Sequence, residues 1–208
     1  MKHLITCVFL FFSMVQFGFG QTAIGFKVGA NIANINLNDD YPGVQNSSRI
    51  GYQAGIIIQR ELTSKVYIRP EVFYSLKGYK LEDGQSTRVG FNYINIPILV
   101  GYKLATKFSA FLGPQLGLLG PVYGTDKNNG RSKNLNSFID YNNLDFGLAA
   151  GVNYVLTPKL NLDLRYTNGF TTILVTDLVD SSGNTTEIDA LKNNKSLEVS
   201  LNYFFKNR

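Results

Sequence analysis

Residues 144–154 of the chain read LDFGLAAGVNY, and every second residue from Leu144 to Tyr154 is apolar. The residues between them are small or polar, including Asp145 and Asn153. Successive side chains of a β-strand point to opposite faces. This stretch, with its flanks at 143–155, therefore predicts a strand with one apolar face and one small or polar face.

The same two-residue period recurs along the chain on both sides of this stretch. Seven further segments show it: 23–34, 50–60, 65–77, 90–103, 107–119, 159–169 and 195–205. A membrane β-barrel directs apolar residues to lipid and polar or small residues to its lumen. A soluble sandwich also alternates, so the period alone does not decide between the two.

The links between the segments favour the membrane barrel. Three links are short: Glu61–Ser64, Leu104–Thr106 and Leu156–Pro158. Four are long and rich in Asn, Asp, Ser and Gly: 35–49, 78–89, 120–142 and 170–194. Short periplasmic turns alternate with long external loops in outer-membrane barrels. The sequence therefore predicts an all-β fold, an eight-stranded antiparallel up-and-down transmembrane β-barrel with both mature termini at the periplasmic end.

Aromatic residues on the apolar face fall near the two ends of the segments, as expected for rings at membrane interfaces. Those near the short turns are Tyr102, Phe108, Tyr154 and Phe205, and those near the long loops are Tyr52, Tyr74, Phe146 and Tyr166. The general preference of strands for aromatic residues is the alternative explanation.

The first twenty residues resemble a secretory signal, with Lys2 at a basic start and an apolar core over 4–12. We expect residues 1–20 to be a cleaved signal peptide and 21–208 to be the outer-membrane barrel domain. Cleavage removes Cys7 and His3, the only Cys and His of the chain, and lowers the formal charge from +5 to +4 by removing Lys2.

A mature chain without Cys or His cannot form disulfides, His-based triads or Cys/His zinc sites. We therefore expect a non-enzymatic protein with no catalytic residues, no cofactor and no metal site. The remaining positive charge is scattered without a Lys/Arg run, so nucleic acid is not an expected partner.

Charged residues occur at positions that the alternation directs into the lumen. They are Lys27, Arg69, Glu71, Lys103, Asp145, Asp163, Arg165 and Glu198. Eight strands leave an interior just wide enough for side chains to fill, and buried charges must be paired. We interpret these residues as a structural salt-bridge network, with a proton or ion path as the alternative.

Pro70, Pro97 and Pro114 fall within predicted strands, although proline cannot donate a ladder hydrogen bond. We expect β-bulges at these points, or strand ends displaced by a few residues.

Four stretches, in order, carry a family resemblance: RPEVFYSLKG at 69–78, YINIPILV at 93–100, GPQLG at 113–117 and DFGL at 145–148. With them the mature chain resembles the PorT-like outer-membrane β-barrel family, common in Bacteroidetes-type Gram-negative bacteria. The resemblance implies an outer-membrane barrel in the cell envelope, with prolines as family features. The family's namesake is linked to protein secretion and surface export, but the resemblance assigns no residue a role.

The last segment resembles the assembly signal that the barrel insertion machinery reads, with Tyr203 and Phe205 as its aromatic positions. It departs from the usual pattern because Lys206, Asn207 and Arg208 follow. The expected partners are therefore outer-membrane lipid and, during assembly, the insertion machinery.

The last long link, 170–194, contains two apolar, β-branched runs around the turn residues 181–184. We interpret it as a hairpin that extends beyond the membrane and whose exposed edge can bind a strand of a protein partner. The alternative is that it is a stiff loop without a partner.

The function that follows is a non-enzymatic outer-membrane barrel acting through external loops, in adhesion, surface interaction or secretion. Three alternatives stay open. They are a narrow transport pore, a soluble periplasmic ligand-binding barrel, which would need an apolar interior and a polar exterior, and an enzyme that works by His-free chemistry.

Overall fold

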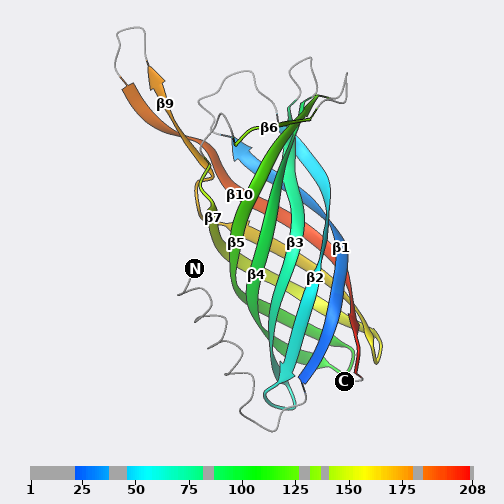
Figure 1. Cartoon of the computed structure of the whole chain (residues 1–208). Coiled ribbons are helices and arrows are strands. Elements are labelled where there is room, and N and C mark those ends of the chain that lie inside the picture. The colour runs from blue at the N-terminus through cyan, green and yellow to red at the C-terminus, as the bar shows by residue number, and fades with distance from the viewer. Residues whose placement is uncertain are drawn as a thin grey trace, which may run out of the picture.

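The structure is a computed structural model that describes residues 22–37, 46–81, 87–126, 132–136, 141–179 and 185–206. The described residues form strands joined by turns and irregular segments (Figure 1). The strands are β1 (Thr22–Leu37), β2 (Asn46–Glu61), β3 (Val66–Leu81), β4 (Thr87–Ala105), β5 (Phe108–Asp126), β6 (Ser132–Asn134), β7 (Leu144–Thr157), β8 (Leu160–Gly169), β9 (Leu174–Val179) and β10 (Thr185–Phe204). No helix among the described residues is long and apolar enough to cross a membrane. The expected signal peptide, residues 1–20, lies outside the described residues.

Eight of these strands form a closed antiparallel ring in the order β1-β2-β3-β4-β5-β7-β8-β10, because β10 pairs back onto β1. The closing pairs run from Gly25 with Phe204 to Leu37 with Leu191. The predicted eight-stranded barrel is confirmed. Most strands run further than predicted at the long-loop end, and the short strands β6 and β9 add to β5 and β10 there.

The two faces of the wall differ as the alternation predicts. Outward apolar side chains are exposed, as in Ile50 at 71% and Val28 at 55%, whereas the inward Lys27 and Arg69 are fully buried. A soluble ligand-binding barrel needs the opposite distribution, so the structure speaks against that alternative. The predicted belt aromatics face outward; Tyr74 is half-buried, and the other seven are exposed.

The expectation of bulges at the prolines was wrong. Pro70 pairs with Ile98 and Pro97 with Gln115, and Pro114 pairs with Leu148. The register is the same on both sides of each proline. The prolines therefore lie inside regular strands, where each one costs a ladder hydrogen bond without adding a residue. The register shifts occur elsewhere, for example between Ser48 and Gln53 of β2.

At the long-loop end, part of the lumen is filled by apolar side chains. Inward side chains of β3, β4 and β5 pack there against Tyr141 and Ile173 from the segments that flank β7 and β9. We call this group the apolar cap; it consists of Tyr79, Val89, Phe91, Tyr93, Leu119, Val122, Tyr141 and Ile173. Such a core inside the barrel mouth fixes the strands where they have left the apolar band.

Candidate functional site

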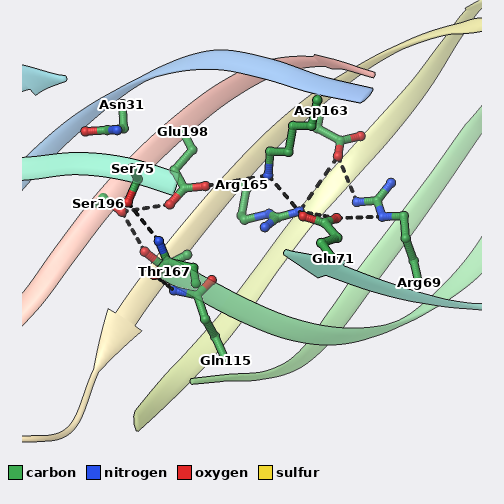
Figure 2. A network of polar contacts seen from close by, with 12 residues as sticks. Asn31, Arg69, Glu71, Ser75, Gln115, Asp163, Arg165, Thr167, Ser196 and Glu198 are labelled. Carbon is green, nitrogen blue, oxygen red and sulfur yellow. Dashed lines mark hydrogen bonds and ion pairs between the residues drawn. The ribbon is translucent and has the colours of Figure 1, made fainter. Parts of the chain in front are cut away.

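Six charged side chains meet in the middle of the lumen, and all six are fully buried. Figure 2 labels all of them except Lys27. We call them the lumen cluster: Lys27 of β1, Arg69 and Glu71 of β3, Asp163 and Arg165 of β8, and Glu198 of β10. In the ring order β3 and β8 are four strands apart, so contacts between them span the barrel.

Glu71 is the centre of the lumen cluster. Its carboxylate accepts hydrogen bonds from Arg165 Nη2 at 2.7 and 2.9 Å and from Lys27 Nζ at 3.2 Å. Arg69 Nε lies 2.9 Å from the same carboxylate. One carboxylate from β3 is thus in contact with cations of β1, β3 and β8.

Asp163 and Glu198 are the other two carboxylates of the lumen cluster, and they pair with Arg69 and Lys27. Asp163 lies 2.7 Å from Arg69 Nη2 and accepts a hydrogen bond from Asn153 Nδ2 at 2.6 Å. Glu198 lies 4.0 Å from Lys27 Nζ and accepts a hydrogen bond from Ser196 Oγ at 3.0 Å. Three cations therefore meet three carboxylates, and the formal charges of the cluster cancel.

Two buried aromatic rings flank the cations. Lys27 Nζ lies 4.2 Å from the ring centre of Phe73, and the Arg69 guanidinium lies 4.5 Å from that of Phe111. Arg165 lies within 6 Å of both ring centres. Rings at this distance stabilise desolvated cations through their negative faces. With paired charges and packed rings, the geometry favours the structural interpretation of the cluster over an ion path.

Two residues of the predicted network lie elsewhere. Lys103 is partly exposed at the short-turn end, where it pairs with Glu61 at 2.7 Å. Asp145 lies at the long-loop end, with Asn194 Nδ2 at 3.5 Å. The alternation assigned both residues to the lumen, but it carries no information on height, so it joined residues from three levels into one network.

The alternation placed Lys77 on the inward face as well, but the predicted charge network did not include it. Lys77 is buried beside Tyr93, with its Nζ 5.7 Å from the ring centre. The apolar cap gave no comparable signal, because part of it comes from Tyr141 and Ile173 in irregular segments.

The apolar cap occupies part of the lumen at the long-loop end. Backbone hydrogen bonds hold the added segments in place, from Leu119 N to Asn143 O and from Asn142 N to Ile173 O. Burial raises the pKa of the Tyr79 and Tyr141 phenols, so both remain neutral at ordinary pH. The cap is therefore an uncharged core.

The lumen contains a small cavity at the short-turn end. The cavity measures about 140 Å³ and is lined by Gln59, Glu61, Tyr67, Lys103 and neighbouring residues of the β4–β5 and β7–β8 turns. Its volume corresponds to a few water molecules, well below the roughly 300 Å³ of small-molecule sites. In its lining, the Tyr67 hydroxyl and Ser109 Oγ lie 3.2 Å apart.

The predicted hairpin is present at the long-loop end. Within it, β9 pairs with β10 from Leu174–Leu191 to Val179–Thr185. Figure 1 shows β9 and the first part of β10 extending away from the barrel wall. In the sheet order β9 is terminal, so among the described residues its second edge has no paired strand.

The residues of the expected assembly signal face outward at the short-turn end. Tyr203 and Phe205 are about half exposed, and their rings lie 6.2 Å apart. Phe205 also contacts Phe26 edge-to-face, with ring centres 5.1 Å apart. Recognition of these residues by the insertion machinery stays a prediction.

A family model described as "Outer membrane protein beta-barrel domain" matches residues 16–175. The chain belongs to this family. Membership agrees with the apolar outer face and the closed ring, and it assigns the barrel to the outer-membrane class. The finer PorT-like assignment is not part of this match. No curated protein sequence matches the chain.

Several solved structures of outer-membrane proteins are similar to this chain. Neisserial surface protein A (NspA) superposes with a TM-score of 0.56 at 16% identity, covering 89% of this chain and 99% of that one. Ail, the attachment invasion locus protein of Yersinia pestis, gives 0.48 at 11%, covering 89% and 99%. A major outer membrane protein of Thermus thermophilus gives 0.45 at 16%, covering 88% and 100%. At these identities the likeness to NspA shows the fold alone.

Proposed function

We propose that the chain is exported by residues 1–20, resides in the outer membrane and acts without catalysis through its external segments. Its role is that of an adhesion, surface-interaction or secretion-associated component. The resemblance to the PorT-like family favours the secretion-associated form of this role.

The observation that carries the proposal is the filling of the barrel at two levels. The lumen cluster occupies the middle, and the apolar cap occupies the long-loop end. A filled interior leaves the outside of the molecule as the surface where partners bind. At the long-loop end the hairpin of β9 and β10 offers them a strand edge.

Partner binding at this hairpin would use strand addition. An unpaired strand edge presents N–H and C=O groups that an extended segment of another protein can pair with. The described edge of β9, Leu174–Val179, is six residues long, which is enough for an added strand of ordinary length. We therefore place the expected protein partner at residues 170–194.

The absence of Cys from the mature sequence gives a direct test of the topology. A single cysteine at Thr186 should react with a membrane-impermeant maleimide on intact cells. The matched control is a single cysteine at Ser64, in the β2–β3 turn, which should react only after the outer membrane is permeabilised. Labelling of Ser64→Cys on intact cells, with Thr186→Cys protected, would invert the proposed orientation.

The function itself is tested by replacing residues 175–189 with a short Gly-Ser turn. Cells that display the intact barrel should be retained on a host-cell monolayer, or should support export of surface proteins, and the variant should lose that activity at least about tenfold. A variant with Gly-Ser in place of Leu62–Ser64, at the opposite end, should retain it. Equal activity of the intact and hairpin-replaced barrels would reject the hairpin as the functional surface.

A further inference from the structure

We propose that Arg49, Lys80 and Arg88 form a binding site for the phosphate groups of outer-leaflet lipid on the external rim of the barrel. We call these three residues the rim cations. The inference rests on the outer-membrane location proposed above and adds a lipid ligand to it.

A local irregularity in β2 brings Arg49 to the outer face. Ser48 pairs with Tyr79 and Gln53 with Ser75, so β2 has one residue more than β3 between these pairs. An extra residue places two consecutive side chains on one side of a strand. The adjoining Ile50 is 71% exposed on the outer face.

Gly90 makes room for the Arg49 guanidinium. Gly78 of β3 and Gly90 of β4 are directly paired, at outward positions next to the buried Tyr79 and Val89. A Cβ atom on Gly90 would lie 2.3 Å from Arg49 Nη1. The guanidinium therefore lies against Gly90, at a place where any side chain would displace it.

The other two rim cations face each other across the same strands. Lys80 and Arg88 are directly paired on β3 and β4, and both occupy outward positions. Like charges directly opposite each other in a sheet destabilise it. Arg88 is also an electrostatic neighbour of Arg49. Three positive charges thus gather on one patch at a cost that an anion would offset.

Among the side chains that the structure describes, which do not include that of Asp126, no carboxylate supplies that anion. The other electrostatic neighbours of Arg49 are the phenols of Tyr52 and Tyr74, and no ion pair of the described part of the chain involves a rim cation. Glu82 and Asp83 of the connecting loop lie outside the described residues. The experiment below decides whether an acidic loop or a lipid neutralises the patch.

The height of the patch above the apolar band of the wall indicates which ligand binds there. On β4 the last exposed apolar side chain is Ile94, and Gly90 and Arg88 are four and six residues beyond it, about 13 and 20 Å along a tilted strand. Tyr52 and Tyr74, with ring centres 5.9 Å apart, lie just below, as expected for an interfacial belt. Cations directly above the apolar band lie among lipid head groups, and arginine pairs with phosphate through two parallel hydrogen bonds.

The test compares lipid A bearing two phosphates with the fully dephosphorylated lipid, both titrated onto the refolded mature protein in detergent and counted by native mass spectrometry. Wild type should retain the phosphorylated lipid, and R49A/R88A should retain at least about tenfold less. Retention of the dephosphorylated lipid should be equally low in both. The control K65A/K107A, which removes two exposed cations at the short-turn end, should behave as wild type.

Equal retention by wild type and R49A/R88A overturns the proposal, as does equal retention of the two lipids. Competition by millimolar inorganic phosphate would overturn the lipid as the source and identify a site for free phosphate. If R49A/R88A fails to fold, K80A/R88A decides in the same way, because Arg49 then keeps its position on Gly90. Failure of the topology test would be visible in cells and would leave this binding result readable on its own.

Discussion

Glu71 is the residue on which the interior of the barrel depends most. Its carboxylate contacts Lys27, Arg69 and Arg165, and all four side chains are fully buried. Removal of one partner from a buried ion pair leaves uncompensated charge in a poorly hydrated place. Within the cluster no described carboxylate other than Asp163 and Glu198 remains to hold three cations.

We therefore expect Glu71→Gln to destabilise the folded barrel by about 3–5 kcal/mol. Urea unfolding of the refolded protein in detergent, followed by the gel shift between unboiled and boiled samples, measures this. The matched control is Glu61→Gln, which breaks the partly exposed pair with Lys103 and should cost about 0–1 kcal/mol. Similar losses in the two variants would mean that the lumen cluster contributes no more than a surface pair.

Gly101 tests the packing of the lumen near the short-turn end. A Cβ atom there would lie 2.0 Å from the Tyr67 ring, so the ring would have to move. We expect Gly101→Ala to lower the unfolding free energy by about 1–3 kcal/mol. Gly120→Ala is the control, because its nearest neighbour would be Asn92 O at 3.4 Å, an ordinary contact. Urea midpoints that coincide for the two alanine variants would contradict this account.

At the level of the elements, periodicity predicted which side chains face the lumen but not how high they lie. All eight wall strands were found, and Lys27, Arg69, Glu71, Asp163, Arg165 and Glu198 do meet. Rough height was available from the distance of a residue to the end of its segment, because Lys103 adjoins Tyr102 near a short link and Asp145 adjoins Phe146 near a long one. The charge network was predicted from the facing of the side chains alone and did not use this distance. This is why Lys103 and Asp145 were joined to a cluster from which they are separate.

The prolines and the rim show a second limit of the sequence. Alternation cannot distinguish a regular strand that lacks one hydrogen bond from a bulged one, so Pro70 was assigned a bulge that it does not have. The real extra residue in β2 lies between Ser48 and Gln53, where no proline marks it. The apolar cap was equally hidden, because its members come from strands and irregular segments far apart in the sequence.

The hairpin of β9 and β10 should be separable from the wall. Its pairs from Thr176–Ile188 to Val179–Thr185 involve no other described strand, whereas Leu174 packs against the apolar cap. We expect replacement of residues 175–189 by a short Gly-Ser turn to leave the urea midpoint of the barrel unchanged within about 0.5 kcal/mol. A variant that also removes Leu174 should lose stability. A large loss in the first variant would show that the hairpin supports the wall.

At the scale of the whole molecule, the filled interior predicts that the barrel does not conduct ions. An eight-stranded barrel has room for side chains only, and here the lumen cluster and the apolar cap occupy successive levels. In planar bilayers we expect the mature protein to show conductance indistinguishable from zero. Stable single-channel steps would favour the alternative of a narrow pore and would require a passage past both levels. A refolded sample that shows the gel shift is the necessary control for insertion.

The pairing of β1 with β10 sets the order of events in the making of this barrel. Gly25 and Phe204 are partners although 179 positions separate them, so the ring stays open until nearly the last residue of the chain has been delivered. Contacts of such high sequence separation form slowly, because the entropy of closing the long loop must be overcome first. Until then the sheet has two free edges and an exposed apolar face, both prone to aggregation. A chain that lacks β10 cannot close the ring onto β1. Such a chain avoids aggregation only as long as it is kept unfolded during export.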